Sequence, residues 1–366
     1  MELLKKFKIN GVLFGAVMLL IIIGLVNLYS AVYNWEAGGT QSIFWSQLIW
    51  VLIGLVLMAV TIIIDYHLFE SISIWFYILI ISLLAAAVFF GVEVNGTRGW
   101  LKLGPFSIQP AEFSKLAYVL IAARYFGRHS FPEGIGFWEL WKPALLVVIP
   151  FGLIIAQGDL GSAAFLVMIF GTFALFGGMK KKALIFLVVF ALVGAIVVST
   201  FFLKGYQRSR IFNFLHPESD MRGSGYHLVQ SKIAVGSGKF FGKGYLKGNI
   251  NKLRYLPERH TDFIFPVLAE EWGFLGSTVL IAMYLIIMLS AVEIAKRARD
   301  RFATFLAVGV TAILFWQVLV NLYGVLGLMP LTGVPLPFMS YGGSSMIALL
   351  VSMGILFNLD SKRFKF

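Results

Sequence analysis

The sequence predicts an all-α integral membrane protein: a polytopic bundle of about ten transmembrane helices with one long extracytoplasmic loop. Only 13% of the 366 residues are charged and 59% are hydrophobic, whereas soluble domains carry about 25% charged residues. The apolar residues gather in stretches of about 20, the length that a helix needs to cross a bilayer. Lys and Arg are concentrated in alternate loops, as expected when the cytoplasmic loops are the basic ones.

This composition also excludes several classes of protein. Disordered and collagen-like chains do not tolerate so many apolar residues. The formal net charge of +12 would suggest a nucleic-acid partner for a soluble protein. In a membrane protein the position of the charges carries the information, so we expect no nucleic acid. The absence of cysteine excludes disulfides and thiolate metal sites.

Ten apolar stretches account for the predicted spans. The first follows a basic start and lacks a small-residue cleavage site, so we interpret it as a retained helix. The fourth, fifth and sixth are short and are interrupted by polar residues. The eighth is long and carries Glu270, Glu271 and Gly273, which predicts a bent or tilted helix. The predicted spans are 11–33, 43–64, 72–92, 111–125, 140–156, 161–178, 183–203, 263–295, 302–328 and 343–359.

The distribution of Lys and Arg orients these spans. Sixteen of them lie near the two ends of the chain and in the fourth, sixth and eighth loops, all on one side if there are ten spans. The short loops of the opposite side hold only Arg98 and Lys102. Because cytoplasmic loops carry the excess of basic residues, both termini are predicted to be cytoplasmic. The whole chain, 1–366, is interpreted as a single membrane domain.

One long loop, 204–262, lies on the outer side and carries eleven Lys and Arg against four acidic residues. It is either a solvated basic face, a surface attracted to anionic headgroups, or the binding surface of an anionic substrate. Its segment 236–248, GSGKFFGKGYLKG, is rich in Gly and Lys. Backbone N–H groups of such a turn can hold phosphate, with a lysine as partner. Helical apolar spacing just before it predicts a helix over 225–235 on the membrane surface.

Charged side chains within membrane segments are costly and mark candidate functional residues. Glu112 and Lys115 are three residues apart and share one face of a helix. They form either a self-neutralising structural pair or a pair that lines a substrate site, and we expect them to line a cavity because an ion pair facing lipid would be hard to insert. Asp159, in QGDLGS, lies at the outer edge between two spans, as a helix cap or as a site residue.

Asp262 lies where the basic loop enters the eighth span. It is either the N-cap of that helix or a carboxylate general base whose pKa is raised by partial desolvation at the membrane edge. Glu270 and Glu271 lie about two turns deeper. Adjacent residues of a helix point in different directions, so at most one of the two is expected to line a cavity.

The segment 330–345, PLTGVPLPFMSYGGSS, combines helix-breaking prolines with several glycines and serines. Irregular backbone at membrane depth is tolerated only where it is buried in protein or lines a cavity. We therefore predict that it forms a wall of the site, where Ser340 offers a hydroxyl to the substrate. The sequence contains neither the GxSxG motif of serine hydrolases nor the HExxH motif of zinc peptidases.

Five of these stretches closely resemble the SEDS family (shape, elongation, division and sporulation), the polytopic glycosyltransferases of bacterial cell-wall synthesis. The resemblance covers nearly the whole chain and includes the number of spans. The short termini, together with YHLVQSK and PERHTDF, resemble the elongation member rather than the division member. One departure is Lys239, where the family often has glycine. The resembling stretches are NGTRGWLKLGPFSIQPAEFSK (95–115), QGDLGS (157–162), LHPESDMRGSGYHLVQSKIAVGSGKFFGKG (215–244), LPERHTDFIFPVLAEEWGFLG (256–276) and GVPLPFMSYGGSS (333–345).

The resemblance implies an enzyme of the bacterial inner membrane that polymerises lipid II into glycan strands during cell elongation and rod-shape maintenance. Lipid II is a disaccharide pentapeptide linked to undecaprenyl pyrophosphate. Asp262 would be the essential carboxylate, and Glu112, Lys115 and Asp159 match family positions implicated in function. A class B penicillin-binding protein would be the partner that supplies transpeptidase activity.

The residues themselves fit this chemistry. Asp262 would take the proton of the acceptor sugar 4-hydroxyl as the oxygen attacks the anomeric carbon of the donor, whose leaving group is a lipid pyrophosphate. A cation of the outer loop would stabilise the departing pyrophosphate; Arg210 and Lys243 are the candidates, and a divalent metal is the alternative.

Two other classes of protein stay open. A lipid II flippase would need an intramembrane polar path, which Glu112 and Lys115 would line. A non-catalytic scaffold for a penicillin-binding protein would need neither Asp262 nor a basic cleft. The first would transport lipid II without making polymer, and the second would act through partner binding alone.

Overall fold

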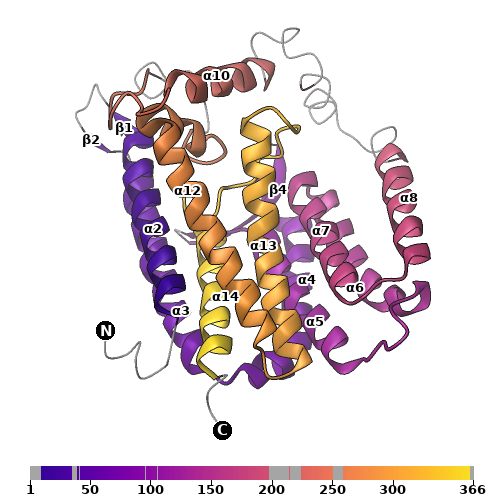
Figure 1. The fold of residues 1–366 in the computed structure, drawn as a ribbon. Coiled ribbons are helices and arrows are strands. Elements are labelled where there is room, and N and C mark those ends of the chain that lie inside the picture. Colours follow the sequence, from indigo (N-terminus) through magenta and orange to yellow (C-terminus); the bar gives the residue numbers. More distant parts are fainter. Residues whose placement is uncertain are drawn as a thin grey trace.

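The structure is a computed structural model that describes residues 10–34, 39–40, 42–94, 96–104, 106–197, 214, 224–249 and 259–362. The described residues form eleven helices and five short strands. Ten of the helices form a bundle, and α10 (Ser224–Ser237) lies across one end of it, which we call the loop face (Figure 1). The first helix, α2 (Gly11–Val32), begins and the last, α14 (Gly343–Lys362), ends at the opposite, terminal face.

The ten bundled helices coincide with the ten predicted spans, which confirms the predicted fold class. The others are α3 (Ser42–Ile63), α4 (Tyr66–Phe90), α5 (Pro110–Arg128), α6 (Phe137–Ala156), α7 (Leu160–Phe176), α8 (Lys181–Val197), α12 (Ile264–Lys296) and α13 (Arg301–Val325). Seven of the ten have the length and apolar composition to cross a membrane. Of the other three, α7 and α8 have 17 residues each, and α5 carries Glu112, Lys115 and Arg124 along its length.

Capping residues explain where several helices begin. Helix α4 begins at Tyr66, six residues before the predicted span, because the Asp65 carboxylate accepts a hydrogen bond from the His67 amide at 2.9 Å. In the same way, the side chain of Asn10 caps α2. Helix α5 has Pro110 at its first position, where the missing N–H leaves no intrahelical bond unmade.

Helix α12 is bent, as predicted, at Gly273, whose φ of 67° lies in the left-handed region that glycine tolerates. The bend frees backbone N–H groups of the helix. Phe274 N donates to Lys239 O at 2.8 Å, and Leu275 N donates to Phe240 O at 3.1 Å. The segment that follows α10 therefore docks into the bend and supplies the acceptors that the helix itself lacks there.

Five short strands on the loop face were not predicted from the sequence. They connect α2 to α3 and α4 to α5. Arg98 N donates to Gln157 O at 2.9 Å, which ties the second set of strands to the connection between α6 and α7. The antiparallel strands are β1 (Tyr33–Asn34) with β2 (Gly39–Thr40), and β3 (Val92–Val94) with β4 (Thr97–Leu103) and β5 (Phe106–Ile108).

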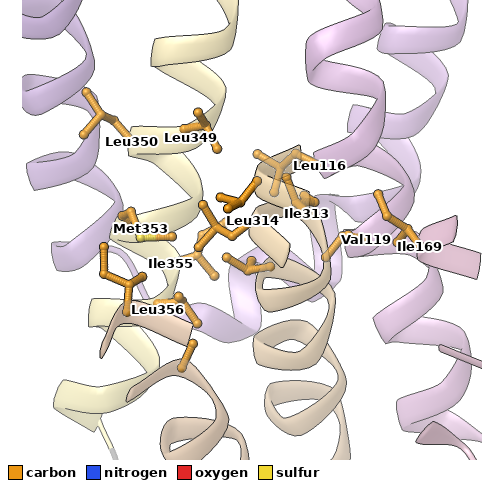
Figure 2. Packing of buried hydrophobic residues seen from close by; sticks show 14 of the residues in the cluster. Leu116, Val119, Ile169, Ile313, Leu314, Leu349, Leu350, Met353, Ile355 and Leu356 are labelled. Carbon is orange, nitrogen blue, oxygen red and sulfur yellow. The ribbon is translucent and has the colours of Figure 1, made fainter. Parts of the chain in front are cut away.

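The centre of the bundle is an apolar cluster to which α5, α7, α13 and α14 contribute (Figure 2). Leu116, Leu314 and Leu349 lie within it. Gly309 of α13 faces Val119 of α5 and the Phe173 ring of α7, which a Cβ at Gly309 would overlap. Small residues permit such close approach between helices in a membrane, so this glycine sets the spacing of three central helices.

Helix α10 confirms the predicted helix over 225–235. Leu228 and Ala234 are buried against the protein, and Ser231 Oγ donates to Val325 O at 2.6 Å. The other two apolar positions of the predicted pattern, Val229 and Ile233, are exposed. Helix α10 is thus anchored on the bundle by one side; its contact with the membrane surface stays a prediction.

Candidate functional site

The predicted pair of Glu112 and Lys115 is present in α5. Lys115 Nζ donates to Glu112 Oε1 at 2.8 Å, and the two side chains are only 2% and 5% exposed. The Lys115 ammonium group also lies 5.4 Å from the centroid of the Phe165 ring on α7, a distance at which a cation is attracted to an aromatic face. The expectation that this pair is buried in the protein rather than facing lipid is confirmed.

The pair lines a small cavity of about 10 Å³ between α5, α13 and α14, which is at the lower limit for one water molecule. Gln317 and Ser352 line the same cavity. Glu112 Oε2 and Gln317 Oε1 have no hydrogen-bond partner among the described residues. Because both are acceptors, the cavity favours a hydrogen-bond donor.

Asp159 is the N-cap of α7, as one of its two interpretations predicted. Its carboxylate accepts hydrogen bonds from Ser162 N at 2.9 Å and from Ser162 Oγ at 2.7 Å, and Gln109 Nε2 lies at 3.3 Å. Burial raises the pKa of Asp159, an effect that the bonds from Ser162 oppose. Glu112 and Lys115 are close enough to act electrostatically on the same carboxyl group, so the three predicted residues form one cluster.

Asp262 lies one residue before the N-cap position of α12. That position belongs to Phe263, which makes no side-chain cap, so the interpretation of Asp262 as the N-cap residue is wrong. The segment around Asp262 is fixed instead through its main chain. Asn321 Nδ2 donates to Asp262 O at 3.1 Å, and Ser340 Oγ donates to Thr261 O at 2.6 Å. One residue earlier, His260 O accepts from the main-chain amide of residue 341 at 2.8 Å.

Three consecutive carbonyl groups therefore attach the 260–262 segment to α13 and to the 334–341 part of the PLTGVPLPFMSYGGSS loop. We call this set of three bonds the carbonyl clamp. Ser340 was predicted to offer its hydroxyl to the substrate. In the structure, that hydroxyl is used twice within the protein, because it also accepts from Leu336 N at 2.8 Å, and Ser340 is buried. The hydroxyl therefore holds the Asp262 segment in place, and its contact with the substrate stays a prediction.

The Gly- and Lys-rich segment binds an anion of the protein itself. Lys243 Nζ donates to Glu270 Oε1 at 2.6 Å, and Asn249 N donates to the same oxygen at 3.0 Å. Main-chain groups of Leu246 and Gly248 hydrogen bond to the Glu271 carboxylate. We call residues 238–249 the docking segment.

Glu271 is held from a second direction as well, because Ser30 Oγ of α2 donates to Glu271 Oε1 at 2.5 Å. Both Glu270 and Glu271 are buried, and the expectation that at most one of them lines a cavity stays a prediction. The docking segment contacts both carboxylates because it follows the bend of α12, while Glu271 Oε2 has no hydrogen-bond partner among the described residues.

Lys243 was a candidate for binding the pyrophosphate, and its side chain is 29% exposed. Its ammonium group is already paired with a buried carboxylate, so its main contribution is to neutralise Glu270. The other candidate cation, Arg210, lies outside the described residues. Within the described residues, no group of three or more His, Cys, Asp or Glu side chains could hold a metal ion.

Sequence reasoning missed several polar residues of the loop-face half of the bundle. Asn321 and Gln317 lie within an otherwise apolar helix, and both are buried. Gln109 links two parts of the site, because its Nε2 reaches Asp159 and its main-chain N donates to Ser344 Oγ at 2.9 Å. A polar amide in the middle of an apolar span was the signal that could have identified the first two, since such groups are costly unless they have a partner.

Comparisons with known proteins agree with this arrangement. The profile of the FtsW/RodA/SpoVE family, described as "Cell cycle protein", matches residues 11–365. Peptidoglycan glycosyltransferase MrdB of Escherichia coli K12 is 40% identical over 361 residues, which cover 98% of this chain and 96% of MrdB. Peptidoglycan glycosyltransferase RodA of Treponema pallidum is 31% identical, with 93% and 95% of the two chains covered.

Two solved structures have the same fold. A chain from the structure described as "Structural coordination of polymerization and crosslinking by a peptidoglycan synthase complex" superposes with a TM-score of 0.83 at 29% identity and covers 98% of this chain and 99% of that one. The crystal structure of RodA from Thermus thermophilus gives a TM-score of 0.72 at 27% identity, with 98% of both chains covered. The chain therefore belongs to the FtsW/RodA/SpoVE family of cell cycle proteins, the SEDS family.

Proposed function

We propose that this SEDS protein is a peptidoglycan glycosyltransferase that polymerises lipid II during cell elongation. The observation that carries the proposal is the carbonyl clamp, which holds the Asp262 segment at the loop face between α12, α13 and the 334–341 segment. The names of MrdB and RodA, both peptidoglycan glycosyltransferases, support the reaction class. Enzymes hold reacting groups in a fixed geometry because small displacements are costly in rate, and the clamp provides such a geometry.

In the proposed reaction Asp262 is the general base. Its carboxylate takes the proton of the acceptor 4-hydroxyl, the hydroxyl oxygen forms a bond to the anomeric carbon of the donor, and the bond from that carbon to the pyrophosphate oxygen breaks. The electron pair leaves with the lipid pyrophosphate. Inversion at an α-linked donor gives a β-1,4 bond. General base catalysis of this kind contributes about 10²–10⁴-fold to a rate.

The substrate cluster of Glu112, Lys115 and Asp159 is proposed to position lipid II rather than to take part in proton transfer. The carboxylate of Glu112 and the ammonium group of Lys115 lie inside the bundle, where an electrostatic interaction is stronger than in water. The basic residues of the 204–262 loop, with Arg210 as a candidate, would face the pyrophosphate.

The loop face is proposed to be extracytoplasmic and both termini cytoplasmic, in the inner membrane of a bacterium. The connections that carry Arg128, Lys180, Lys182 and Arg299 lie at the terminal face, and basic connections are cytoplasmic in membrane proteins. The partner is proposed to be a class B penicillin-binding protein. The support is the fold shared with a chain of a structure whose description joins polymerisation to crosslinking.

A polymerisation assay tests the proposal. The purified full-length protein, with and without its penicillin-binding partner, is incubated with labelled lipid II, and the products are separated by size. We expect glycan polymer in the presence of the partner. Movement of lipid II across vesicle membranes without polymer would support the flippase instead, and partner binding with neither activity would support the scaffold.

A further inference from the structure

A second pocket lies at the terminal face, and its lining residues are distant in sequence from the Asp262 segment. It has a volume of about 330 Å³ and lies between the beginning of α6 and the beginning of α8. This volume falls within the usual range for pockets that hold small ligands, about 300–1,000 Å³. Its lining residues are Gly136, Phe137, Lys180, Lys182, Ala183 and Phe186. The proposed glycosyl transfer uses none of them.

Two aromatic rings form the apolar wall of this pocket. Phe137 begins α6 and Phe186 lies in the second turn of α8, and their ring centroids are 4.8 Å apart with the planes at 82°. Such an edge-to-face contact holds both rings in place. Both residues are nevertheless exposed on their other sides. The pocket thus offers a preformed apolar surface where two apolar helices begin.

Two lysines line the same pocket, mainly with the hydrocarbon part of their side chains. Lys180 and Lys182 are exposed, and neither makes an ion pair with a carboxylate among the described residues. The carboxylate of Glu139 lies beside Gly136, but Glu139 is not a lining residue. The lining therefore carries two positive charges and no negative one, which favours an anion.

The two connections beside the pocket are joined through their main chains. The connection before α6 and the connection before α8 pair as a parallel bridge between Ile135 and Met179. Ile135 N donates to Gly178 O at 3.0 Å, and Lys180 N donates to Ile135 O at 2.9 Å. The main chain of Lys180 is thereby held close to the first residue of α6.

The surroundings of the pocket have the composition of a membrane interface. Trp138 and Trp141, in the first turns of α6, are both exposed. Lys142 Nζ lies 5.7 Å from the centroid of the Trp141 ring. Exposed Trp side chains beside Lys at the ends of apolar helices are typical of the headgroup level of a bilayer. A ligand in this pocket would therefore have its charged end at the headgroups and its apolar end in the hydrocarbon.

We propose that this pocket binds an anionic phospholipid. The headgroup phosphate lies between the ammonium groups of Lys180 and Lys182, and the upper part of an acyl chain lies along Phe137 and Phe186. Basic pockets between membrane helices bind anionic headgroups in this manner. A soluble phosphate compound would use the lysines but not the exposed faces of the two aromatic rings, which is why we assign the site to a lipid.

The first experiment measures lipid affinity. The full-length protein is placed in nanodiscs of dioleoylphosphatidylcholine, and dioleoylphosphatidylglycerol is titrated while bound lipid is counted by native mass spectrometry after release. We expect Lys180→Gln/Lys182→Gln to weaken phosphatidylglycerol binding by about 30-fold, since each lysine near an anionic headgroup contributes about fivefold in affinity. Retention of wild-type affinity by this double variant would overturn the proposal.

A matched control separates a site from a general surface charge. Lys296→Gln/Arg299→Gln removes two exposed positive charges from the same face, at the connection between α12 and α13. We expect this variant to bind phosphatidylglycerol as the wild type does. An equal loss of affinity in both double variants would mean that only the summed charge of the face attracts the lipid, and the proposed pocket would be wrong.

A third variant tests the apolar part. Phe186→Ser keeps both lysines and removes one wall, so we expect it to weaken phosphatidylglycerol binding about tenfold. Glycerol 3-phosphate, added at up to millimolar concentration, should not displace the lipid from the wild type. Displacement by this soluble phosphate, or no effect of Phe186→Ser, would assign the site to a soluble anion and overturn the lipid proposal.

Discussion

The side-chain amide of Asn321 donates a hydrogen bond to the main-chain oxygen of Asp262 at 3.1 Å and a second to Val334 O at 2.7 Å. One buried side chain thus joins α13, the Asp262 segment and the proline-rich loop. Its oxygen, Oδ1, has no hydrogen-bond partner among the described residues, so the role of Asn321 here is that of a double donor.

Replacement of Asn321 by leucine should therefore reduce polymerisation without unfolding the protein. The change removes the Asn321 hydrogen bonds to Asp262 O and Val334 O and so loosens the Asp262 segment, and a displacement of about 1 Å in a catalytic group can cost about 10²-fold in rate. We expect a fall in kcat of that order with lipid II, and little change in KM. Trp316→Phe, on the same helix, removes only the bond from Trp316 Nε1 to Thr172 Oγ1 and serves as the control. Equal activity of the two variants would contradict a positioning role for Asn321.

Asp262→Asn tests the proposed base directly. Asn keeps the size and the main-chain contacts of Asp, but a carboxamide is far too weak a base to take the hydroxyl proton. Polymerisation should fall by about 10²–10⁴-fold, while the thermal midpoint stays near that of the wild type because Asn is of the same size and can accept the same hydrogen bonds from main-chain N–H groups. Asp300→Asn, at the N-cap of α13 on the terminal face, should keep its activity. Near wild-type polymerisation by Asp262→Asn would refute the mechanism.

The pair of Glu112 and Lys115 allows structure and function to be separated. Lys115→Met leaves a buried carboxylate without its partner and should lower the thermal midpoint strongly, since breaking a buried pair costs about 3–5 kcal/mol. Glu112→Gln/Lys115→Met removes both charges and should recover most of that stability. If the pair positions lipid II, the stable double variant should still polymerise poorly. A double variant that regains both stability and activity would show that the pair is only structural.

Gly238 tests whether the docking segment must contact α12 closely. A Cβ at Gly238 would overlap Ala269 O, whereas a Cβ at Gly236, two residues earlier, would meet no atom within 4 Å. Gly238→Ala should loosen residues 238–249, seen as faster amide hydrogen exchange and easier proteolysis there. Gly236→Ala should leave the rates of hydrogen exchange and proteolysis unchanged or lower them, because alanine favours the helix by about 1 kcal/mol relative to glycine. Identical exchange in the two variants would argue against the close contact.

Lys239 is the residue at which this chain departs from the glycine that the SEDS family often has, and its φ of 50° lies in the left-handed region. A residue with a Cβ loses about 1–2 kcal/mol in that conformation. Lys239→Gly should therefore stabilise the docking segment and slow its hydrogen exchange. Lys232→Gly, inside α10, should do the opposite, because glycine destabilises a helix interior by about 1 kcal/mol.

The local patterns of the sequence predicted those features that depend on near neighbours. Apolar length identified the ten spans, Gly273 indicated the bend of α12, and a spacing of three residues placed Glu112 beside Lys115. For the Gly- and Lys-rich segment the sequence predicted phosphate binding, which stays a prediction. The internal partner of Lys243 was not predicted, because Glu270 lies 27 residues away and nothing local distinguishes an internal carboxylate from a substrate phosphate.

Local sequence patterns did not predict the contacts between residues that are distant in the chain. Asn321 is separated from Asp262 by 59 residues, and Ser30 from Glu271 by 241. The pairing depends on how the helices pack, and a buried amide can find a carbonyl group on any neighbouring helix. For the same reason the hydroxyl of Ser340 was assigned to the substrate, although in the folded protein it holds Thr261.

The order in which the chain is synthesised gives the carbonyl clamp a further consequence. Ser30, Lys243 and Asn249, which bind the two glutamates of α12, all precede that helix and have left the ribosome before it does. By contrast, Asn321 and Ser340 follow Asp262 in the chain and emerge after α12. A nascent chain that ends before α13 can therefore pair the buried carboxylates of α12, but it lacks the donors of the carbonyl clamp. The protein would therefore become competent for catalysis only when its translation is nearly finished.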